Sequence, residues 1–188
     1  MFKDLEFLWD MGNEKEHYRG QSRIDYEEGE WLYNLIQALP TLPTLVEIGR
    51  KFGGTTLLLA LSRPDIKVSS VDNAPYDDFR VVSQMKRFHL FNTDLIVGDS
   101  KTCINDHLDI DLLFIDGDHS KEGCLADYYH WSPRVKNGGH IIFHDAVGDR
   151  ADMGCVEAVN ELVTLGILKN EHKSVSSMRH FIHGNQDR

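Results

Sequence analysis

Apolar residues are spaced along the chain with two periods, one typical of helices and the other of buried strands. After Asp25 they recur three and four positions apart, in the stripe Trp31, Leu32, Leu35, Ile36 and Leu39. Asp25 is a favourable helix-capping residue, Glu28 stands three positions after it, and Pro40 ends the pattern. The spacing therefore predicts an amphipathic helix that begins at Asp25 and ends before Pro40.

Short β-rich runs alternate with helical segments through the middle of the chain. The predicted strands are residues 44–48, 67–72, 94–97, 110–116 and 140–143. The predicted helices run from Thr55 to near Pro64 and over residues 77–90, 100–107, 120–131 and 152–165. Such alternation is typical of a parallel sheet. Residues 112–115 are all apolar, which predicts a central strand covered on both faces.

The two ends of the chain depart from this alternation. Residues 169–174 and 178–183 read as two more strands, and the connection between them is too short for a crossover helix, so we expect an antiparallel pair. Residues 1–24 form a predicted N-terminal arm, with the apolar residues Phe2, Leu5, Leu8 and Trp9. These side chains pack either on the domain formed by residues 25–188 or on a second subunit of a homo-oligomer.

Composition and charge narrow the class of protein. The 188 residues include 20 Lys and Arg against 30 Asp and Glu, a formal charge of −10. This acidic balance, without a basic run, excludes nucleic acid and anionic membrane as expected partners. The apolar run Leu57–Leu61 is too short to span a bilayer, and the charged first residues do not resemble a secretory signal. Three widely spaced cysteines indicate a reducing, cytoplasmic compartment.

The segment from Glu47 to Thr55 joins a predicted strand to a predicted helix and contains Gly49, Gly53 and Gly54. Glycines there let the backbone turn sharply and approach a ligand, although an ordinary strand-to-helix turn is the alternative. Asp72 ends the next strand, where a carboxylate can accept both hydroxyls of an adenosine ribose. The glycine spacing does not match the dinucleotide template, so a nucleoside ligand without phosphate fits better than a nicotinamide cofactor.

Five segments carry a resemblance to a known family. Residues 47–55, E-I-G-R-K-F-G-G-T, resemble the first motif of class I S-adenosylmethionine-dependent methyltransferases. Residues 71–73, V-D-N, and 97–100, V-G-D-S, are similar to the second and third motifs. Residues 114–120, F-I-D-G-D-H-S, and 138–145, G-G-H-I-I-F-H-D, resemble the later motifs of the small O-methyltransferase branch. That branch includes catechol-type, macrocin-type and cephalosporin-hydroxylase-like members.

The resemblance implies a fold and a cofactor. The fold is α/β, a Rossmann-like, doubly wound, mostly parallel seven-stranded sheet of order 3-2-1-4-5-7-6 with the last-placed strand antiparallel and helices on both faces. The implied cofactor is S-adenosyl-L-methionine. Its implied binding residues are Glu47 and Gly49 for the methionine portion, Gly53 in the loop, Asp72 for the ribose, Asn73 for the adenine edge, Asp99 and Ser100 for the adenine amino group, and Asp116. The bulky residues Arg50, Lys51 and Phe52 depart from the small residues of many relatives.

A second group of polar residues, Asp116, Asp118, His119, His144 and Asp145, follows two neighbouring strands. Carboxylates suit Mg²⁺ and Mn²⁺, and imidazole tolerates Mn²⁺, iron and zinc. By resemblance to catechol-type enzymes, Asp116, His144 and Asp145 hold a divalent cation, Mg²⁺ or Mn²⁺, with His144 where those enzymes carry an oxygen ligand. The alternative is a packed imidazole hydrogen-bonded to a carboxylate, with Asp118 or Ser120 as a helix cap.

His119 stands where the resemblance places a catalytic lysine. A histidine there can accept the proton of an acceptor hydroxyl, whereas a helix-capping or solvent-facing histidine is the alternative. The remaining histidines, among them His130 and His172, are assigned to the surface or to packing.

The leading hypothesis is therefore an O-methyltransferase for a small polar acceptor such as a sugar, a catechol-like ring or a natural-product ring, with His119 and Asp116 in catalysis. A non-catalytic S-adenosylmethionine-binding subunit and a non-haem iron oxygenase with two histidines and one carboxylate are the alternatives.

Overall fold

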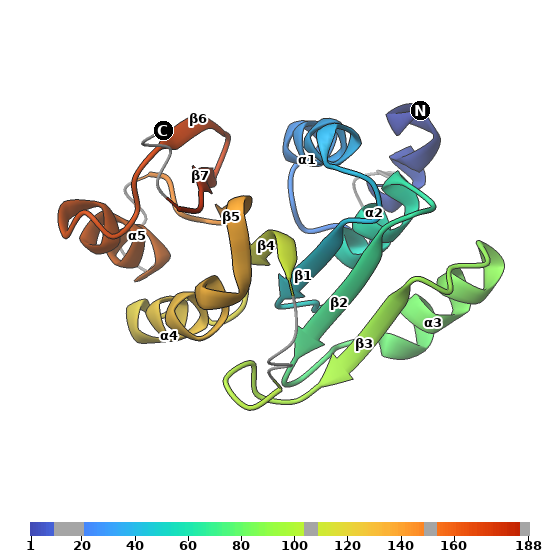
Figure 1. Cartoon of the computed structure of the whole chain (residues 1–188). Helices are drawn as coiled ribbons and strands as arrows, with labels where there is room; N and C mark the ends of the chain where they lie inside the picture. Colours follow the sequence, from blue (N-terminus) through green and yellow to red (C-terminus); the bar gives the residue numbers. More distant parts are fainter. Residues whose placement is uncertain (10–20, 104–108, 149–153, 185–188) are drawn as a thin grey trace.

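The computed structural model describes residues 1–9, 21–103, 109–148 and 154–184. Within these ranges seven strands form one sheet of order β3-β2-β1-β4-β5-β7-β6, with helices on both faces (Figure 1). The strands are β1 (Thr44–Ile48), β2 (Lys67–Asp72), β3 (Thr93–Val97), β4 (Ile110–Ile115), β5 (Val135–Phe143), β6 (Glu171–Val175) and β7 (Met178–Ile182). The helices are η1 (Phe2–Trp9), α1 (Tyr26–Ala38), α2 (Gly54–Ser62), α3 (Asp78–Arg87), α4 (Lys121–Trp131), η2 (Ser132–Arg134) and α5 (Gly154–Thr164).

The strand pairing confirms the expected topology. β1 pairs in parallel with both β2 and β4, and β3 and β5 extend the parallel sheet on either side. β7 is antiparallel to both β5 and β6. The order reverses between β1 and β4, and in doubly wound sheets ligands bind beyond the carboxyl ends of the strands at this point. The fold therefore directs attention to the loops after β1, β2 and β4.

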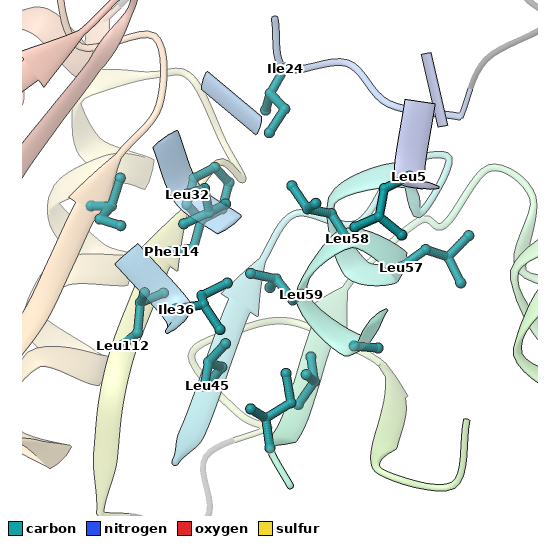
Figure 2. Close-up of a cluster of buried hydrophobic side chains, with 14 of the residues drawn as sticks. Leu5, Ile24, Leu32, Ile36, Leu45, Leu57, Leu58, Leu59, Leu112 and Phe114 are labelled. Carbon is teal, nitrogen blue, oxygen red and sulfur yellow. The ribbon is translucent and has the colours of Figure 1, made fainter. Parts of the chain in front are cut away.

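Alternate side chains of the central strands enter two separate cores. Leu45 of β1 and Leu112 and Phe114 of β4 pack with η1, α1 and α2 on one face (Figure 2). Val46 of β1 and Leu113 of β4 pack with α4 and α5 on the other face. Every residue of β4 is buried, because both faces of this strand are covered. The prediction of a central strand from its continuous apolar run is thus confirmed.

The first nine residues pack on their own domain. Phe2, Leu5 and Leu8 are buried in the core that contains α1 and α2, and Figure 2 shows Leu5 directed towards Leu57 and Leu58 of α2. The Trp9 indole Nε1 donates to the Ile24 carbonyl at 2.7 Å. Of the two packing partners expected for these apolar residues, the domain is the one that the described arm contacts. A homo-oligomer through the arm stays a prediction.

Most predicted elements match the observed ones, with differences at their ends. β1 and β2 agree residue for residue with the predicted strands, whereas β5 begins at Val135, five residues before its predicted start. Residues 100–102 form a turn where a helix over 100–107 was expected, and residues 104–108 lie outside the described ranges, as do residues 152 and 153 of the last predicted helix. Across the described ranges, we find no helix with the length and hydropathy that a membrane span requires.

Candidate active site

A cavity of about 690 Å³ opens at the carboxyl ends of β1, β2, β3, β4 and β5. This volume lies in the range of small-molecule binding sites. The predicted residues that line the cavity are Gly49, Asp72, Asn73, Asp99, Ser100, Asp116, His119, His144 and Asp145. Two predicted residues, Glu47 and Gly53, do not line it.

The loop after β1 lies directly against the loop after β4. Gly49 has a φ of +91°, and a Cβ built on it would overlap the backbone carbonyl of Asp116. Gly53 has a φ of +75° and caps α2, and a Cβ there would overlap the Val81 side chain. Both positions require glycine for backbone conformation and for space. Gly53 therefore shapes the loop from outside the cavity, and Gly49 lines the cavity.

Arg50, the first bulky residue of this loop, is a buried structural residue. Its side chain is fully buried, and Nε and Nη2 donate to the two carboxylate oxygens of Asp78 at 2.8 and 2.9 Å. Nη1 donates to the Ser70 carbonyl at 2.6 Å. The guanidinium thus joins the β1 loop to β2 and to the first turn of α3. This arrangement explains why the loop accommodates a large residue where many relatives carry a small one.

Asp72 holds the same loop from the end of β2. Its Oδ2 accepts hydrogen bonds from the backbone N–H groups of Arg50 at 2.8 Å and Lys51 at 2.7 Å. Its Oδ1 accepts from the Ala74 N–H at 2.8 Å. A carboxylate oxygen has more than one lone pair, so these bonds leave acceptor capacity on a side chain that lines the cavity. The carboxylate is therefore fixed in place before any ligand arrives.

Glu47 lies behind the loop, among buried hydroxyl groups. Its Oε2 accepts from Ser70 at 2.5 Å and from the Thr56 hydroxyl, and its side chain is inaccessible to solvent. Burial raises the pKa of Glu47 to about 7, against the opposing effect of these hydrogen bonds. Oε1 is one of the buried atoms without a hydrogen-bond partner among the described residues. Glu47 therefore supports the β1 loop from the protein interior, and its side chain does not line the cavity.

The loop after β3 contacts Asp127, a cavity-lining residue of α4 that the sequence did not single out. The Ser100 hydroxyl donates to Asp127 Oδ1 at 2.5 Å, and Asp99 Oδ1 accepts from the Lys101 N–H at 3.0 Å. Asp127 lies on α4, is 4% exposed and lines the cavity beside Gly117. Burial raises the pKa of Asp127 above its usual range. In the sequence it resembles any polar residue of an amphipathic helix, so no pattern reveals it.

Asp116, His144 and Asp145, the three predicted metal ligands, lie close together. One ligand atom from each lies within 4.8 Å of the other two. His144 Nδ1 is 3.1 Å from Asp116 Oδ1 and 3.3 Å from Asp145 Oδ2. Asp145 has a φ of +51°, which turns the chain directly after β5. Among the described residues, this is the group in which three ligand atoms already lie close enough together to share a metal ion.

The other nitrogen of His144 faces a buried glutamate. Nε2 lies 3.2 Å from Glu28 Oε2, and Glu28 is 1% exposed. Glu28 Oε1 accepts from the backbone and hydroxyl of Ser177 at 2.9 and 2.7 Å, and Oε2 accepts from the Asp25 N–H at 2.8 Å. Burial raises the pKa of Glu28, but these hydrogen bonds outweigh it and the pKa is lowered. The sequence revealed Glu28 only as the partner of Asp25 in a capping box.

The carboxylates that face both nitrogens of His144 make its imidazole strongly basic when no metal is bound. Burial lowers the pKa of His144, yet hydrogen bonds to Asp116, Asp145 and Glu28 raise it to about 12. Both ring nitrogens of His144 face carboxylates. A ring that donates a hydrogen bond from each nitrogen is an imidazolium, because neutral imidazole has only one N–H group.

His119 stands at the edge of this group. Nε2 is 3.3 Å from Asp116 Oδ1 and 3.9 Å from Asp145 Oδ2, and 41% of the side chain is exposed. The hydrogen bond to Asp116 raises the pKa of His119 against a smaller effect of burial. Ser120, whose hydroxyl accepts from the Gly123 N–H at 3.0 Å, caps α4. Helix capping therefore belongs to Ser120, and the role of His119 as a base stays a prediction.

Comparisons with known proteins agree with this geometry. Residues 46–146, more than half of the chain, match the model of a family described as a methyltransferase domain. A protein of Staphylococcus aureus solved as a candidate caffeoyl-CoA O-methyltransferase superposes with a TM-score of 0.69 and 17% identity over 87% of this chain and 86% of that chain. TomG of Streptomyces achromogenes, an O-methyltransferase solved with S-adenosylmethionine, superposes with a TM-score of 0.64 and 14% identity over 86% of this chain and 82% of that chain.

A curated relative matches over a shorter segment. The uncharacterized protein R132 of Acanthamoeba polyphaga mimivirus is 39% identical over 54 residues, which are 29% of this chain and 24% of that protein. The chain thus matches about a quarter of the length of that relative. At identities of 14% and 17%, the solved structures show the fold. The family match covers the loops after β1, β2, β3, β4 and β5 that line the cavity. The chain therefore belongs to this methyltransferase-domain family, and its sheet has the strand order that the resemblance to class I S-adenosylmethionine-dependent methyltransferases implied.

Proposed function

We propose that the protein methylates a hydroxyl group of a small polar acceptor, such as a sugar, a catechol-like ring or a natural-product ring. The observation that supports this proposal is the position of His119 beside Asp116 and Asp145, in the same cavity as Gly49 and Asp72. The same cavity is lined by the residues expected for the cofactor and by His119 with the carboxylates of Asp116 and Asp145. An acceptor hydroxyl between His119 and the carboxylates would lie close to a methyl group above Gly49.

A divalent cation fits the donor set of Asp116, His144 and Asp145. Two carboxylates and one imidazole lie close enough to share an ion. His144 Nε2 is held by buried Glu28, which fixes the ring with Nδ1 towards the carboxylates. Metal-binding histidines are commonly oriented by a carboxylate in this way. Imidazole favours Mn²⁺ over Mg²⁺ in this set. When bound, the ion would lower the pKa of the acceptor hydroxyl and orient it.

His119 would take the proton from that hydroxyl. Its imidazole is half exposed and can therefore reach an acceptor in the cavity. Asp116 orients the ring through its 3.3 Å contact and stabilises the imidazolium that proton transfer creates. The acceptor oxygen would then displace S-adenosylhomocysteine in line at the sulfonium methyl. Alignment of the two reacting groups in one cavity is the main contribution of the protein.

The test is a methyl-transfer assay that follows S-adenosylhomocysteine with a panel of catechols and sugars, with and without a chelator. We expect chelation and Asp116→Asn to abolish transfer, and Mn²⁺ to restore the chelated enzyme better than Mg²⁺. We expect His119→Ala to reduce kcat by about 10²- to 10⁴-fold. His130→Ala is the matched control, because His130 lies on the exposed side of α4 with its ring against the Ala126 carbonyl. Full activity in chelator together with an unaffected His119→Ala variant would refute both roles.

The alternative of an iron oxygenase has less support in the geometry. A facial triad needs two histidines and one carboxylate. The group brought together in the described ranges has one histidine and two carboxylates, with His119 outside it. We further propose a cytoplasmic location, which agrees with the free thiols of Cys103, Cys124 and Cys155. A non-catalytic role would appear in the assay as cofactor binding without transfer to any acceptor.

A further inference from the structure

Three histidines lie in a row across the strands β5, β7 and β6, away from the cavity. The register pairs Ile142 of β5 with His180 of β7, and His172 of β6 with the same His180. His140 is two residues from Ile142, so its side chain lies on the same face of the sheet. His140, His180 and His172 therefore occupy neighbouring positions on three consecutive strands. None of them lines the active-site cavity.

The rings of this row are in close contact. His140 Nδ1 lies 2.8 Å from His180 Nε2, and the two rings are stacked with centroids 5.1 Å apart. The ring of His172 lies on the other side, with its centroid 5.1 Å from that of His180. The rings of Trp31 of α1 and His180 are in a T-shaped contact with their centroids 5.3 Å apart. His180 is 4% exposed, whereas His172 is exposed to solvent.

The pair of facing nitrogens has room for one proton between them. If one nitrogen carries the hydrogen, the other presents a lone pair, and a metal ion can replace that hydrogen. Burial lowers the pKa of His140 and that of His180. Neutral imidazole is the form that binds metal ions.

We propose that His140 and His180 chelate a divalent transition-metal ion such as Zn²⁺, Cu²⁺ or Ni²⁺, with His172 turning in as a third ligand. Imidazole is a preferred ligand of these ions, and hard ions such as Mg²⁺ bind it poorly. Zn–N bonds of about 2.0–2.1 Å place two ligands of a tetrahedral ion about 3.3 Å apart, so the pair must separate by about half an ångström. His172 is exposed and can rotate, and a third nitrogen there would add a cross-link between β6 and the neighbouring strands.

The site is distinct from the group at Asp116, His144 and Asp145 and does not depend on the proposed reaction. The two differ in chemistry, since one offers only nitrogen ligands and the other offers one nitrogen and two carboxylates. The experiment therefore uses the Asp116→Asn/Asp145→Asn double variant of the full chain, in which the carboxylate group is disabled. Asn tolerates the positive φ at position 145.

Isothermal titration of chelator-treated double variant with Zn²⁺ should show one bound ion per chain. Adding His140→Gln or His172→Gln to that background should remove or weaken this binding, whereas His130→Gln should leave it unchanged. With Cu²⁺, electron paramagnetic resonance should show coupling to two or three nitrogens. Thermal unfolding without metal checks that each variant is folded, because His172 and His140 are more exposed than His180.

Two results would overturn the proposal. One is a double variant that binds no Zn²⁺ or Cu²⁺ while it unfolds at the same temperature as the parent. The other is binding that His140→Gln and His172→Gln leave unaltered, with a spectrum that shows a single nitrogen. Either result would assign the row to packing alone.

Discussion

Replacing Glu47 by Gln should remove a pH dependence of stability that arises at one buried position. Burial raises the pKa of Glu47 from 4.5 to about 7 in the folded protein. An acid whose pKa is higher in the folded state favours folding when protonated and opposes it when ionised. Its contribution is therefore most favourable below pH 4.5 and is lost as the pH rises from 4.5 to about 7.

The size of the effect follows from the same two values. A difference of roughly 2.5 pKa units at about 1.4 kcal/mol each gives a loss of about 3 kcal/mol across this pH window. The glutamine side chain of the variant carries no charge and shows no such loss. Its amide can keep the acceptor role towards Ser70 and Thr56, while its NH₂ group replaces Oε1, which has no described partner. An unsatisfied amide would cost about 1–3 kcal/mol, but this cost is the same at every pH.

The assay is urea unfolding of the wild type and Glu47→Gln at pH values from below 4.5 to above 7. As the pH rises over this range, we expect the free energy of unfolding of the wild type to fall by about 3 kcal/mol relative to that of the variant. Glu30→Gln, which removes an exposed carboxylate of α1, is the control for a change of net charge. Parallel pH curves for the wild type and Glu47→Gln would refute the reasoning, because they would mean that Glu47 titrates alike in the folded and unfolded states.

Three further predictions concern the loop after β1. Asp72→Ala should weaken S-adenosylhomocysteine binding by about 1.5–3 kcal/mol for each lost charge-assisted hydrogen bond, measured by calorimetry, whereas exposed Asp94→Ala should not. Gly49→Ala should cost more unfolding free energy than Gly138→Ala, because both have positive φ but a Cβ at Gly138 meets nothing within 4 Å; equal losses in urea titrations would mean that backbone strain alone matters. Arg50→Lys should lower stability by about 3 kcal/mol or more, because an ammonium cannot replace the fork that a buried guanidinium presents to a carboxylate; an unchanged urea midpoint would contradict this.

The strands were the most predictable part of the fold, for a physical reason. β1 is a short run rich in β-branched and apolar residues between Pro43 and Gly49, so its limits are encoded locally, and β2 has two valines, one on either side of a pair of serines. The start of β5 was not predictable, because residues 135–139 include Lys, Asn and two Gly, and the strand conformation at Val135 depends on pairing with Ile110 of β4. Polar residues in a strand are stabilised by the neighbouring strand, and the local sequence does not contain that information.

The residues of the candidate site also fall into predictable and unpredictable groups. Four of the site residues lie at the carboxyl ends of strands: Asp72, Asp116, His144 and Asp145. A parallel sheet brings such positions to one edge, and this placement does not depend on side-chain packing. Glu28 and Asp127 reach the site from helices, and their arrival depends on how those helices pack. No local pattern distinguishes an interior glutamate of a capping box from a surface one.

The two interpretations of His144, a metal ligand or a packed imidazole bonded to carboxylates, describe one geometry in two states. Glu28 holds Nε2 in both, because it is fixed by Ser177 and by the capping box of α1. What changes is the occupant of the space between Nδ1 and the carboxylates of Asp116 and Asp145. A proton there gives an ion-paired imidazolium, and a cation there requires that proton to leave. The high pKa of His144, about 12, therefore measures the negative charge that would attract a metal ion to the site. The same charge makes the proton its strongest competitor, so any metal bound there must exchange two carboxylate contacts of the imidazolium for its own coordination bonds.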